Sequence, residues 1–225
     1  DYCAYEVASQ SFLLALTLKK HLLDFVARGR AGAYGQGEGH IVHRLSDQVF
    51  GQIGFGRIAR EQAKMVRGMG MEILVYDPFL KEIQMDGIRL CSTLEEVLLN
   101  SDIVSINTVL NPGTYHMIGM KELKQMKKDS VIVNVSRGAI INTDDLLTAL
   151  REGTIGGAGL DVIEGEPLPP KHPAHQIQNL IYTPHVAMYS EEAMIDLHHK
   201  LTRQALDVLS GKWTVNIVNP KVRDV

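Results

Sequence analysis

From residue 49 onward, short apolar runs bounded by turn residues alternate with segments of helical periodicity, and this alternation constrains the fold more than any other feature. Continuous apolar runs are typical of strands that are buried on both faces of a parallel sheet. Strands are predicted over residues 49–53, 73–76, 102–106, 131–135, 157–162 and 180–183, and helices over residues 57–69, 93–99, 120–126, 143–152 and 190–209. With right-handed crossovers, this order predicts a doubly wound α/β fold, with helices on both faces of a parallel sheet.

Two of the predicted helices begin with capping signals. Thr93 is followed by Glu96, and Asn142 by Asp145, so each pair has the three-residue spacing of a helix N-terminus. These signals support the helices over residues 93–99 and 143–152.

The N-terminal region differs from the rest. Residues 4–28 carry apolar side chains at near-helical spacing around much of the circumference, which predicts a helix covered on several sides. Residues 29–39 contain five glycines, a composition typical of a loop or linker. We therefore expect a domain boundary near this segment.

Composition limits the classes of partner. The 225 residues are 45% hydrophobic and 22% charged, which suits one full globular domain with an incomplete second one. A net charge of -3 gives no general electrostatic attraction for nucleic acid or an anionic membrane, and the apolar run at residues 12–18 is too short to span a bilayer. Cys3 and Cys91 cannot build a disulfide framework, so we expect a reducing, cytoplasmic setting.

Residues 54–59 form a glycine-rich turn, Gly-Phe-Gly-Arg-Ile-Ala, between a predicted strand and a predicted helix. In a G-x-G-x-x-A turn of this kind, Gly54 permits the tight turn, Gly56 lets the backbone approach a pyrophosphate, and Ala59 keeps helix and strand close. The phosphates then lie on a helix N-terminus, where free amides favour negative charge. An ordinary glycine-rich turn remains the alternative for the pattern taken alone.

Asp77 favours the dinucleotide interpretation. It ends the strand predicted over residues 73–76 and lies 21 residues after Gly56, where an acidic side chain accepts hydrogen bonds from a ribose diol. A carboxylate there also repels a 2′-phosphate, so NAD is favoured over NADP. Arg57 offers a possible phosphate contact, which weakens that preference.

Polar residues follow three of the later strands, at the sheet edge where ligands of such folds bind. Arg137 follows residues 131–135, Glu166 comes soon after residues 157–162, and His185 follows residues 180–183. An arginine can pair with a substrate carboxylate, a histidine can protonate a carbonyl oxygen, and a glutamate can orient the histidine. Each has an ordinary structural explanation when taken singly, but their joint placement favours reduction of a 2-oxo acid.

Five ordered blocks carry a family resemblance: GQIGFGRIA, VYDP, VNVSRGAIIN, GAGLDVIEGEPLP and NLIYTPHVA. With these blocks the chain resembles the D-isomer-specific 2-hydroxyacid dehydrogenase family over nearly its whole length. The resemblance implies a Rossmann-type NAD-binding domain and transfer of hydride between NAD(H) and a D-2-hydroxy or 2-oxo acid. It implies a catalytic set of Arg137, Glu166 and His185, and a cofactor site of Gly54, Gly56, Arg57, Ile58, Asp77, Thr108, Val135, Arg137, Asp161 and His185.

The resemblance also implies a domain division. Family members carry about a hundred residues before a segment like DYCAYEVA, which form most of a substrate domain. We therefore expect residues 1–35 to be an interdomain helix and linker, residues 36–205 the NAD-binding domain, and residues 206–225 a return segment towards the substrate domain. The substrate domain is expected to be mostly missing, so that this chain binds NAD but turns over poorly, and the family implies a homodimer with the helix after Ala4 as a plausible contact.

Two alternatives stay open. The segments Val109-Leu110-Asn111 and Tyr189-Ser190-Glu191 resemble the branch of C-terminal-binding-protein corepressors, although Met188 stands where that branch usually has tryptophan. An NAD-binding, redox-sensing scaffold for other proteins is therefore the second functional hypothesis. No metal is expected, because the histidine pairs at 40/43, 172/175 and 198/199 lack a metal-binding helix motif.

Overall fold

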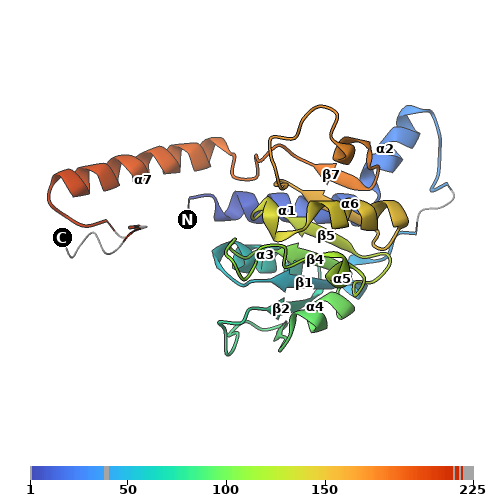
Figure 1. Cartoon of the computed structure of the whole chain (residues 1–225), viewed down its shortest axis with the longest axis horizontal. Helices are drawn as coiled ribbons and strands as arrows, with labels where there is room; N and C mark the ends of the chain where they lie inside the picture. Colours follow the sequence, from blue (N-terminus) through green and yellow to red (C-terminus); the bar gives the residue numbers. More distant parts are fainter. Residues whose placement is uncertain (1, 38–40, 215, 218, 220–225) are drawn as a thin grey trace.

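Seven parallel strands form one sheet in the order β3-β2-β1-β4-β5-β6-β7 (Figure 1). The structure is a computed structural model that describes residues 2–37, 41–214, 216, 217 and 219. The strands are β1 (Val49–Ile53), β2 (Glu72–Tyr76), β3 (Ile88–Leu90), β4 (Ile103–Ile106), β5 (Val131–Asn134), β6 (Gly157–Leu160) and β7 (Leu180–Tyr182). Because the strand order reverses between β1 and β4, a topological switch point opens at the carboxyl ends of these two strands.

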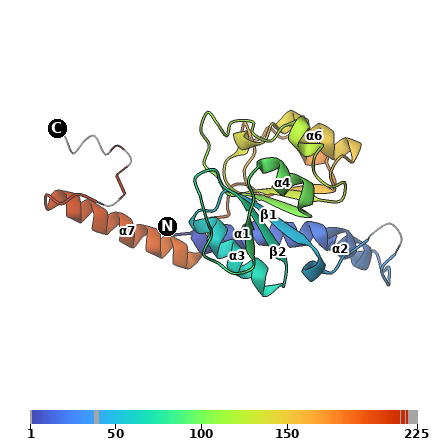
Figure 2. The same ribbon diagram turned by 90° about the horizontal axis from the view of Figure 1, so that it is seen from below.

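Helices cover both faces of the sheet (Figure 2). The α-helices are α1 (Ala4–Lys19), α2 (Leu22–Arg30), α3 (Arg57–Gly68), α4 (Leu94–Asn100), α5 (Met120–Leu123), α6 (Thr143–Glu152) and α7 (Glu191–Leu209), and short 3-10 helices are η1 (Leu45–Asp47), η2 (Gly138–Ile140) and η3 (Pro173–Gln176). Helices α1 and α3 pack on one face, and α4, α5 and α6 lie on the other. The predicted doubly wound α/β fold is confirmed.

Each face has its own hydrophobic core. Phe12 of α1 meets Phe50 of β1 edge to face, with ring centroids 6.1 Å apart, in the cluster under α1 and α3. On the other face, Leu146 and Leu150 of α6 pack in a cluster with Ile132 of β5. A fully buried apolar side chain of this size contributes roughly 1.5–3 kcal/mol to folding, so these clusters fix the helices against the sheet.

Helix α1 lies close on β6 because that strand is built from small residues. A Cβ at Gly159 would come within 2.9 Å of the Cβ of Leu14, and one at Gly157 within 3.0 Å of the side chain of Leu18. Helix α1 therefore packs directly on the sheet, and the predicted division at residue 35 stays a prediction.

The structure corrects two sequence-based predictions. The helix predicted over residues 4–28 is broken, because His21 adopts a left-handed conformation (φ 47°) between α1 and α2. Apolar spacing does not detect a single such residue. The sequence pattern also does not predict β3. This strand has three residues, lies at the lateral edge of the sheet and has partly exposed side chains, so it lacks the apolar run of a buried strand.

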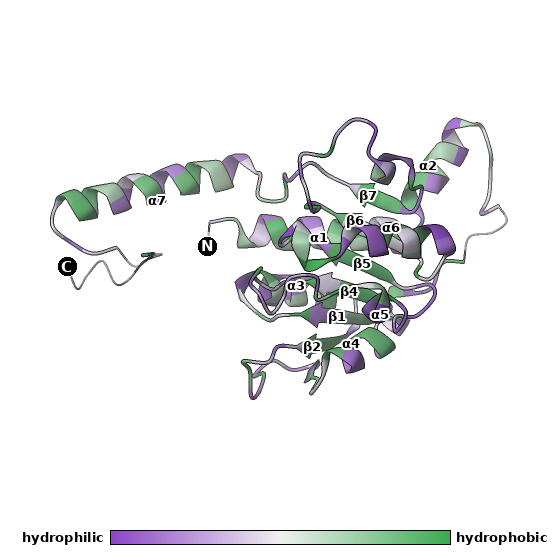
Figure 3. Cartoon of the chain, in the orientation of Figure 1, coloured by the Kyte–Doolittle hydropathy of each residue, from purple (hydrophilic) through white to green (hydrophobic). Residues whose placement is uncertain are grey.

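Helix α7 extends away from the sheet, and Ala193 is its one buried residue among those described. Hydrophobic and hydrophilic residues alternate along it (Figure 3). Its exposed apolar side chains include Ile195, Leu201 and Leu206. Within the described ranges, no helix combines the length and the apolarity that a membrane crossing requires. In the predicted return segment, residues 206–225, most of the residues after Thr214 lie outside the described ones.

Candidate functional site

The glycine-rich turn takes the geometry that its sequence predicts. Gly54 has φ +89°, and a Cβ there would come within 2.7 Å of the backbone oxygen of Asn107. The amide of Gly54 also donates to the carbonyl of Tyr76 at 2.8 Å. Only glycine meets both the left-handed conformation and the close approach of the loop after β4.

The space over Gly56 is open. A Cβ built on this residue meets nothing within 4 Å, and Gly56 is the N-cap of α3 without a side-chain capping bond. The first amides of α3 are therefore not capped by a side chain, and the helix dipole favours an anion at this position. Arg57 is exposed and Ile58 is half-buried in the same first turn. This surface fits the pyrophosphate of a dinucleotide.

Asp77 lies beside the turn, as predicted. One carboxylate oxygen accepts from the amide of Phe55 at 2.9 Å, and the other accepts from the amide of Phe79 at 3.0 Å. Asp77 is half-buried, so the carboxylate braces the turn while part of it stays accessible. Two oxygens offer about four acceptor positions, which leaves capacity for a ribose hydroxyl.

The loops after β4 and β5 form the middle of the switch point. The amide of Asn107 continues the ladder by donating to the carbonyl of Ile53 at 2.8 Å, and half-buried Thr108 follows it. Val135 is buried at the end of β5, and the hydroxyl of Ser136 donates to the carbonyl of Ile106 at 2.8 Å. Thr108 and Val135 thus stand on adjacent, mutually braced loops.

A buried polar network lies beneath the glycine-rich turn, and sequence reasoning missed it. Gln62 of α3 accepts from Gln52 of β1 at 2.7 Å and donates to the hydroxyl of Ser11 of α1 at the same distance. Asn107 donates to Gln62 at 3.2 Å and to the hydroxyl of Ser105 at 3.1 Å. These hydrogen bonds join α1, α3 and the loop after β4 through buried side chains, so the network holds the three segments in register.

At the other end of the site, the structure brings Glu166 and His185 together. The Nδ1 of His185 lies 2.7 Å from the Oε1 of Glu166, and the Oε2 of Glu166 accepts from the amide of Ile163 at 3.1 Å. A carboxylate only accepts hydrogen bonds, so Nδ1 carries the proton and Nε2 faces outward for chemistry. The His185 side chain is 51% exposed, which leaves the ring accessible.

A buried aspartate holds the loop that carries His185. Asp161 is 1% exposed, and its carboxylate accepts from the hydroxyl of Thr183 at 2.5 Å and from the amides of Val186 and Ala187 at 3.0 and 2.8 Å. The backbone of His185, at φ 57°, donates to the carbonyl of Asp161 at 2.9 Å. The family resemblance implies a contact of Asp161 with the nicotinamide amide. The hydrogen bonds by which Asp161 anchors this loop become visible only in the folded structure.

The carboxylates at this edge change the pKa of a neighbouring tyrosine. Burial raises the pKa of Tyr182, and the negative charges of Glu166 and Asp161 raise that pKa further. The edge after β6 and β7 therefore has a negative local electrostatic potential.

Arg137 lies in the loop after β5, on the same edge of the sheet. Its side chain is exposed and donates to the carbonyl of Ser136 at 2.6 Å, while Asn134 donates to the carbonyl of Arg137 at 2.9 Å. The guanidinium has five donors, so this single bond leaves most of them for a ligand. Arg137 contacts neither Glu166 nor His185 among the interactions of the described residues.

Helix α1 also reaches the loop around His185, which sequence reasoning did not predict. Gln10 donates to the hydroxyl of Thr183 at 3.4 Å, and Ser190 donates to the carboxylate of Glu6 at 2.9 Å. A groove of about 440 Å³ between these elements is lined by Tyr5, Ser9 and Val186, among others. Spacing along the chain gives no signal for such contacts, because 173 residues or more separate the partners.

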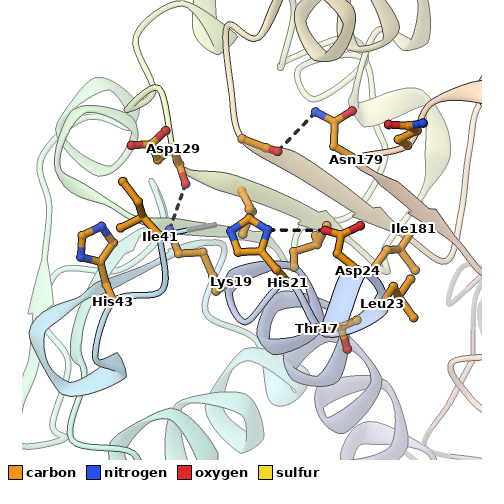
Figure 4. A pocket seen from close by; sticks show the side chains of 14 residues that line it. Thr17, Lys19, His21, Leu23, Asp24, Ile41, His43, Asp129, Asn179 and Ile181 are labelled. Atoms are coloured by element: carbon orange, nitrogen blue, oxygen red, sulfur yellow. Dashed lines mark hydrogen bonds and ion pairs between the residues drawn. The ribbon is translucent and has the colours of Figure 1, made fainter. Parts of the chain in front are cut away.

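A separate cavity of about 280 Å³ lies at the amino ends of the strands, where β5, β6 and β7 begin (Figure 4). Lys19 lies beside it and donates to the carbonyl of Asp129 at 2.9 Å, and burial lowers the pKa of that amine. Because ligands of doubly wound folds bind at the carboxyl ends of strands, this cavity is not the dinucleotide site. The described ranges hold no group of three or more candidate metal ligands, and His40 lies outside them.

The comparisons with known proteins agree with this geometry. Residues 12–187 match the model of the family described as D-isomer specific 2-hydroxyacid dehydrogenase, NAD binding domain. A glyoxylate reductase of Korarchaeum cryptofilum is 38% identical over 192 residues, covering 81% of this chain and 57% of the relative, and one of Thermococcus litoralis is 33% identical over 222 residues, covering 96% and 67%. The NAD-complexed D-isomer specific 2-hydroxyacid dehydrogenase of Lactobacillus delbrueckii ssp. bulgaricus superposes with a TM-score of 0.88 at 28% identity, covering 97% of this chain and 70% of that one. The chain thus spans little more than half the length of several curated relatives that it matches.

Proposed function

Because this chain belongs to the D-isomer-specific 2-hydroxyacid dehydrogenase family and forms its NAD-binding domain, we propose that the protein transfers hydride between NAD(H) and a small 2-hydroxy or 2-oxo acid. The observation that carries this proposal is the 2.7 Å hydrogen bond between Glu166 and His185 at the ligand-binding edge of a dinucleotide fold. A scaffold that only binds NAD has no need of an accessible, oriented imidazole.

His185 is proposed as the acid and base of the reaction. NADH, when bound, supplies the hydride that reduces the carbonyl carbon of the 2-oxo acid. His185 gives its Nε2 proton to the carbonyl oxygen, and in the oxidation direction Nε2 takes the hydroxyl proton back. Glu166 holds Nδ1, so it fixes the tautomer and stabilises the imidazolium that the reaction requires.

Arg137 is proposed as the group that binds the substrate carboxylate. Its guanidinium is exposed on the loop after β5, and a planar fork of donors can pair with both carboxylate oxygens. Lysine would supply the charge without the fork.

The remaining proposed cofactor contacts follow the switch point. Gly54, Gly56, Arg57 and Ile58 would surround the pyrophosphate, Asp77 would accept from the adenosine ribose, and Thr108 would lie on the adenine side. Val135 would contribute backbone, and Asp161 and His185 would face the nicotinamide. The open space over Gly56 and the accessible part of Asp77 support this assignment.

The proposal is tested by following NADH oxidation by the full-length protein with glyoxylate, pyruvate, hydroxypyruvate and longer 2-oxo acids. We expect turnover with at least one of these acids, because each carries the carboxylate for Arg137 and the carbonyl for His185. Binding of NADH without turnover on any of them would instead favour the alternative of an NAD-binding scaffold or corepressor-like module. The glyoxylate reductases among the relatives favour the enzyme over that alternative.

A homodimer and a cytoplasmic location are part of the proposal. Helix α1 uses much of its apolar surface on its own sheet, whereas Leu22, Leu23 and Val26 of α2 are exposed and offer a contact for a second copy. Cys3 and Cys91 are both unpaired, which suits a reducing compartment. Sedimentation equilibrium should give twice the 24.9 kDa chain mass, and Leu23→Asp should halve it.

A further inference from the structure

One short turn carries two glutamates, and each of them meets a histidine. Glu166 bonds to His185, while Glu164 approaches the Nε2 of His116 with both oxygens, at 2.9 and 3.0 Å. The hydroxyl of Tyr115 donates to Glu164 at 3.3 Å, and its ring stacks on that of His116 with centroids 4.0 Å apart. The second pair has no role in the reaction proposed above.

The tautomer of His116 is set from its other side. The amide nitrogen of Asn142 lies 3.5 Å from Nδ1 of His116, while its oxygen caps α6 by accepting from Asp145 at 3.1 Å. Asn142 therefore presents a donor to Nδ1, and the proton of His116 lies on Nε2, facing Glu164. The backbone of His116 has φ 49°, a conformation that residues other than glycine rarely adopt unless their surroundings hold them there.

His116 belongs to a segment that is paired with the residues directly after Arg137. Its amide donates to the carbonyl of Ala139 at 2.9 Å, and the amide of Ile118 donates to the carbonyl of Ile140 at 3.1 Å. A bridge between Ile118 and Ile141 continues this pairing. The loop after β4 and the loop after β5 therefore form one hydrogen-bonded unit.

The turn with the two glutamates presses against that unit at Gly138. A Cβ at Gly138 would come within 2.1 Å of the carbonyl carbon of Ile163 and within 2.4 Å of the amide nitrogen of Glu164. Ile163 and Glu166 are tied to each other in both directions, through the Glu166 amide and the Glu166 carboxylate. A displacement of Glu164 therefore carries Glu166 with it.

We propose that His116 and Glu164 are positioning residues for the reaction: their pair fixes the turn at residues 163–166 against the loops after β4 and β5, so that Glu166 stays in register with His185 and Arg137 keeps its place. The inference rests on the proposed function. The His116 and Glu164 side chains are 29% and 32% exposed, and a single hydrogen bond at a partly exposed site adds little to global stability. A shift of about 1 Å in a catalytic group, in contrast, can lower the rate by about 100-fold.

The test compares Glu164→Ala with Glu164→Gln, which keeps an acceptor for His116, and with Glu152→Ala, an exposed glutamate at the end of α6. Nitrogen-15 spectra of the histidine rings report the tautomer of His185 in the chain itself. We expect Glu164→Ala to weaken the signature of the Nδ1 proton bound to Glu166, and Glu164→Gln and Glu152→Ala to keep it. An unchanged His185 signature in Glu164→Ala, or the same loss in Glu152→Ala, would overturn the proposal.

Kinetics provide the second readout. In the full-length protein, Glu164→Ala should lower kcat by about tenfold or more, while KM for NADH stays within about twofold. Glu164→Gln should recover most of the loss in kcat. A rise in KM for NADH with kcat unchanged would contradict a positioning role. If the wild type shows no turnover, the proposed function fails, whereas the spectra still decide whether Glu164 orients His185 through Glu166.

Discussion

The glycine-rich turn and the edge that carries His185 are built in opposite ways. The turn is one continuous stretch, residues 54–59. It offers backbone amides to a ligand, and the missing side chains at Gly54 and Gly56 make room for the close approach. The edge is assembled from loops after β5, β6 and β7, and its main groups are side chains. A backbone site is therefore encoded locally, whereas a side-chain site depends on the alignment of several strands.

Two aspartates make the same contrast. Asp77 accepts from two backbone amides and stays half-exposed, while Asp161 is 1% exposed and accepts from two amides and a hydroxyl. Both carboxylates brace a loop, but Asp77 keeps capacity for a ligand and Asp161 holds the loop of His185 in place. The predicted contact of Asp161 with nicotinamide stays a prediction.

The comparison implies that chemistry and cofactor binding can be separated by mutation. His185→Ala should lower kcat by about 100-fold to 10,000-fold, because general acid and base catalysis contributes about that much. The dissociation constant for NADH should change by less than about threefold, because the turn is untouched. Steady-state rates and fluorescence titration of NADH measure the two effects, and equal losses in both would show that His185 does not act at the chemistry.

Gly54→Ala should break the other region. Its Cβ would press on the backbone of Asn107 in a left-handed conformation, so the turn must shift away from its dinucleotide geometry. We expect NADH affinity to fall by about 100-fold, since about 2.7 kcal/mol of strain and lost contacts corresponds to that factor. Gly153→Ala is the matched control, because Gly153 is also left-handed (φ 65°) but has open space around it and lies far along the chain. Similar NADH affinities in the two variants would contradict the turn assignment.

Asp77→Ala should have a smaller effect and change selectivity. The loss of a charged acceptor for the ribose costs about 1.5 kcal/mol at a half-exposed site, which is roughly tenfold in NADH affinity. Removal of the carboxylate also removes the repulsion of a 2′-phosphate, so NADPH should bind relatively better. The ratio of NADH to NADPH dissociation constants measures this, and an unchanged ratio would refute the ribose role.

Thr183→Val should have the smallest effect and act on the edge alone. The substitution keeps the side-chain shape but removes one hydrogen bond to buried Asp161 and one from Gln10. We expect the free energy of unfolding to fall by about 1–3 kcal/mol and kcat to fall severalfold, with NADH affinity nearly unchanged. Chemical denaturation and kinetics on the same preparation measure both, and a selective loss of NADH affinity would contradict the separation of the two regions.

The same contrast explains how much could be predicted from the sequence. The buried strands, the turn and the caps at Thr93 and Asn142 were predicted, because hydrophobic period, glycine spacing and capping chemistry are local; both capping bonds are present. Strand β3 was missed because it is short and partly exposed, and the break at His21 because one left-handed residue leaves no mark on apolar spacing. The anchoring bonds of Asp161 and the pairing of His116 with Glu164 join residues 22 to 48 positions apart, so only the fold reveals them.

A crystal structure of this chain grown with NADH would show directly whether the switch point holds the dinucleotide. We expect the pyrophosphate in the open space over Gly56 at the start of α3, the adenosine ribose on Asp77, and the nicotinamide beside the edge that carries Glu166 and His185. A dinucleotide bound elsewhere, or bound with its nicotinamide at Asp77, would show that the proposed site is wrong.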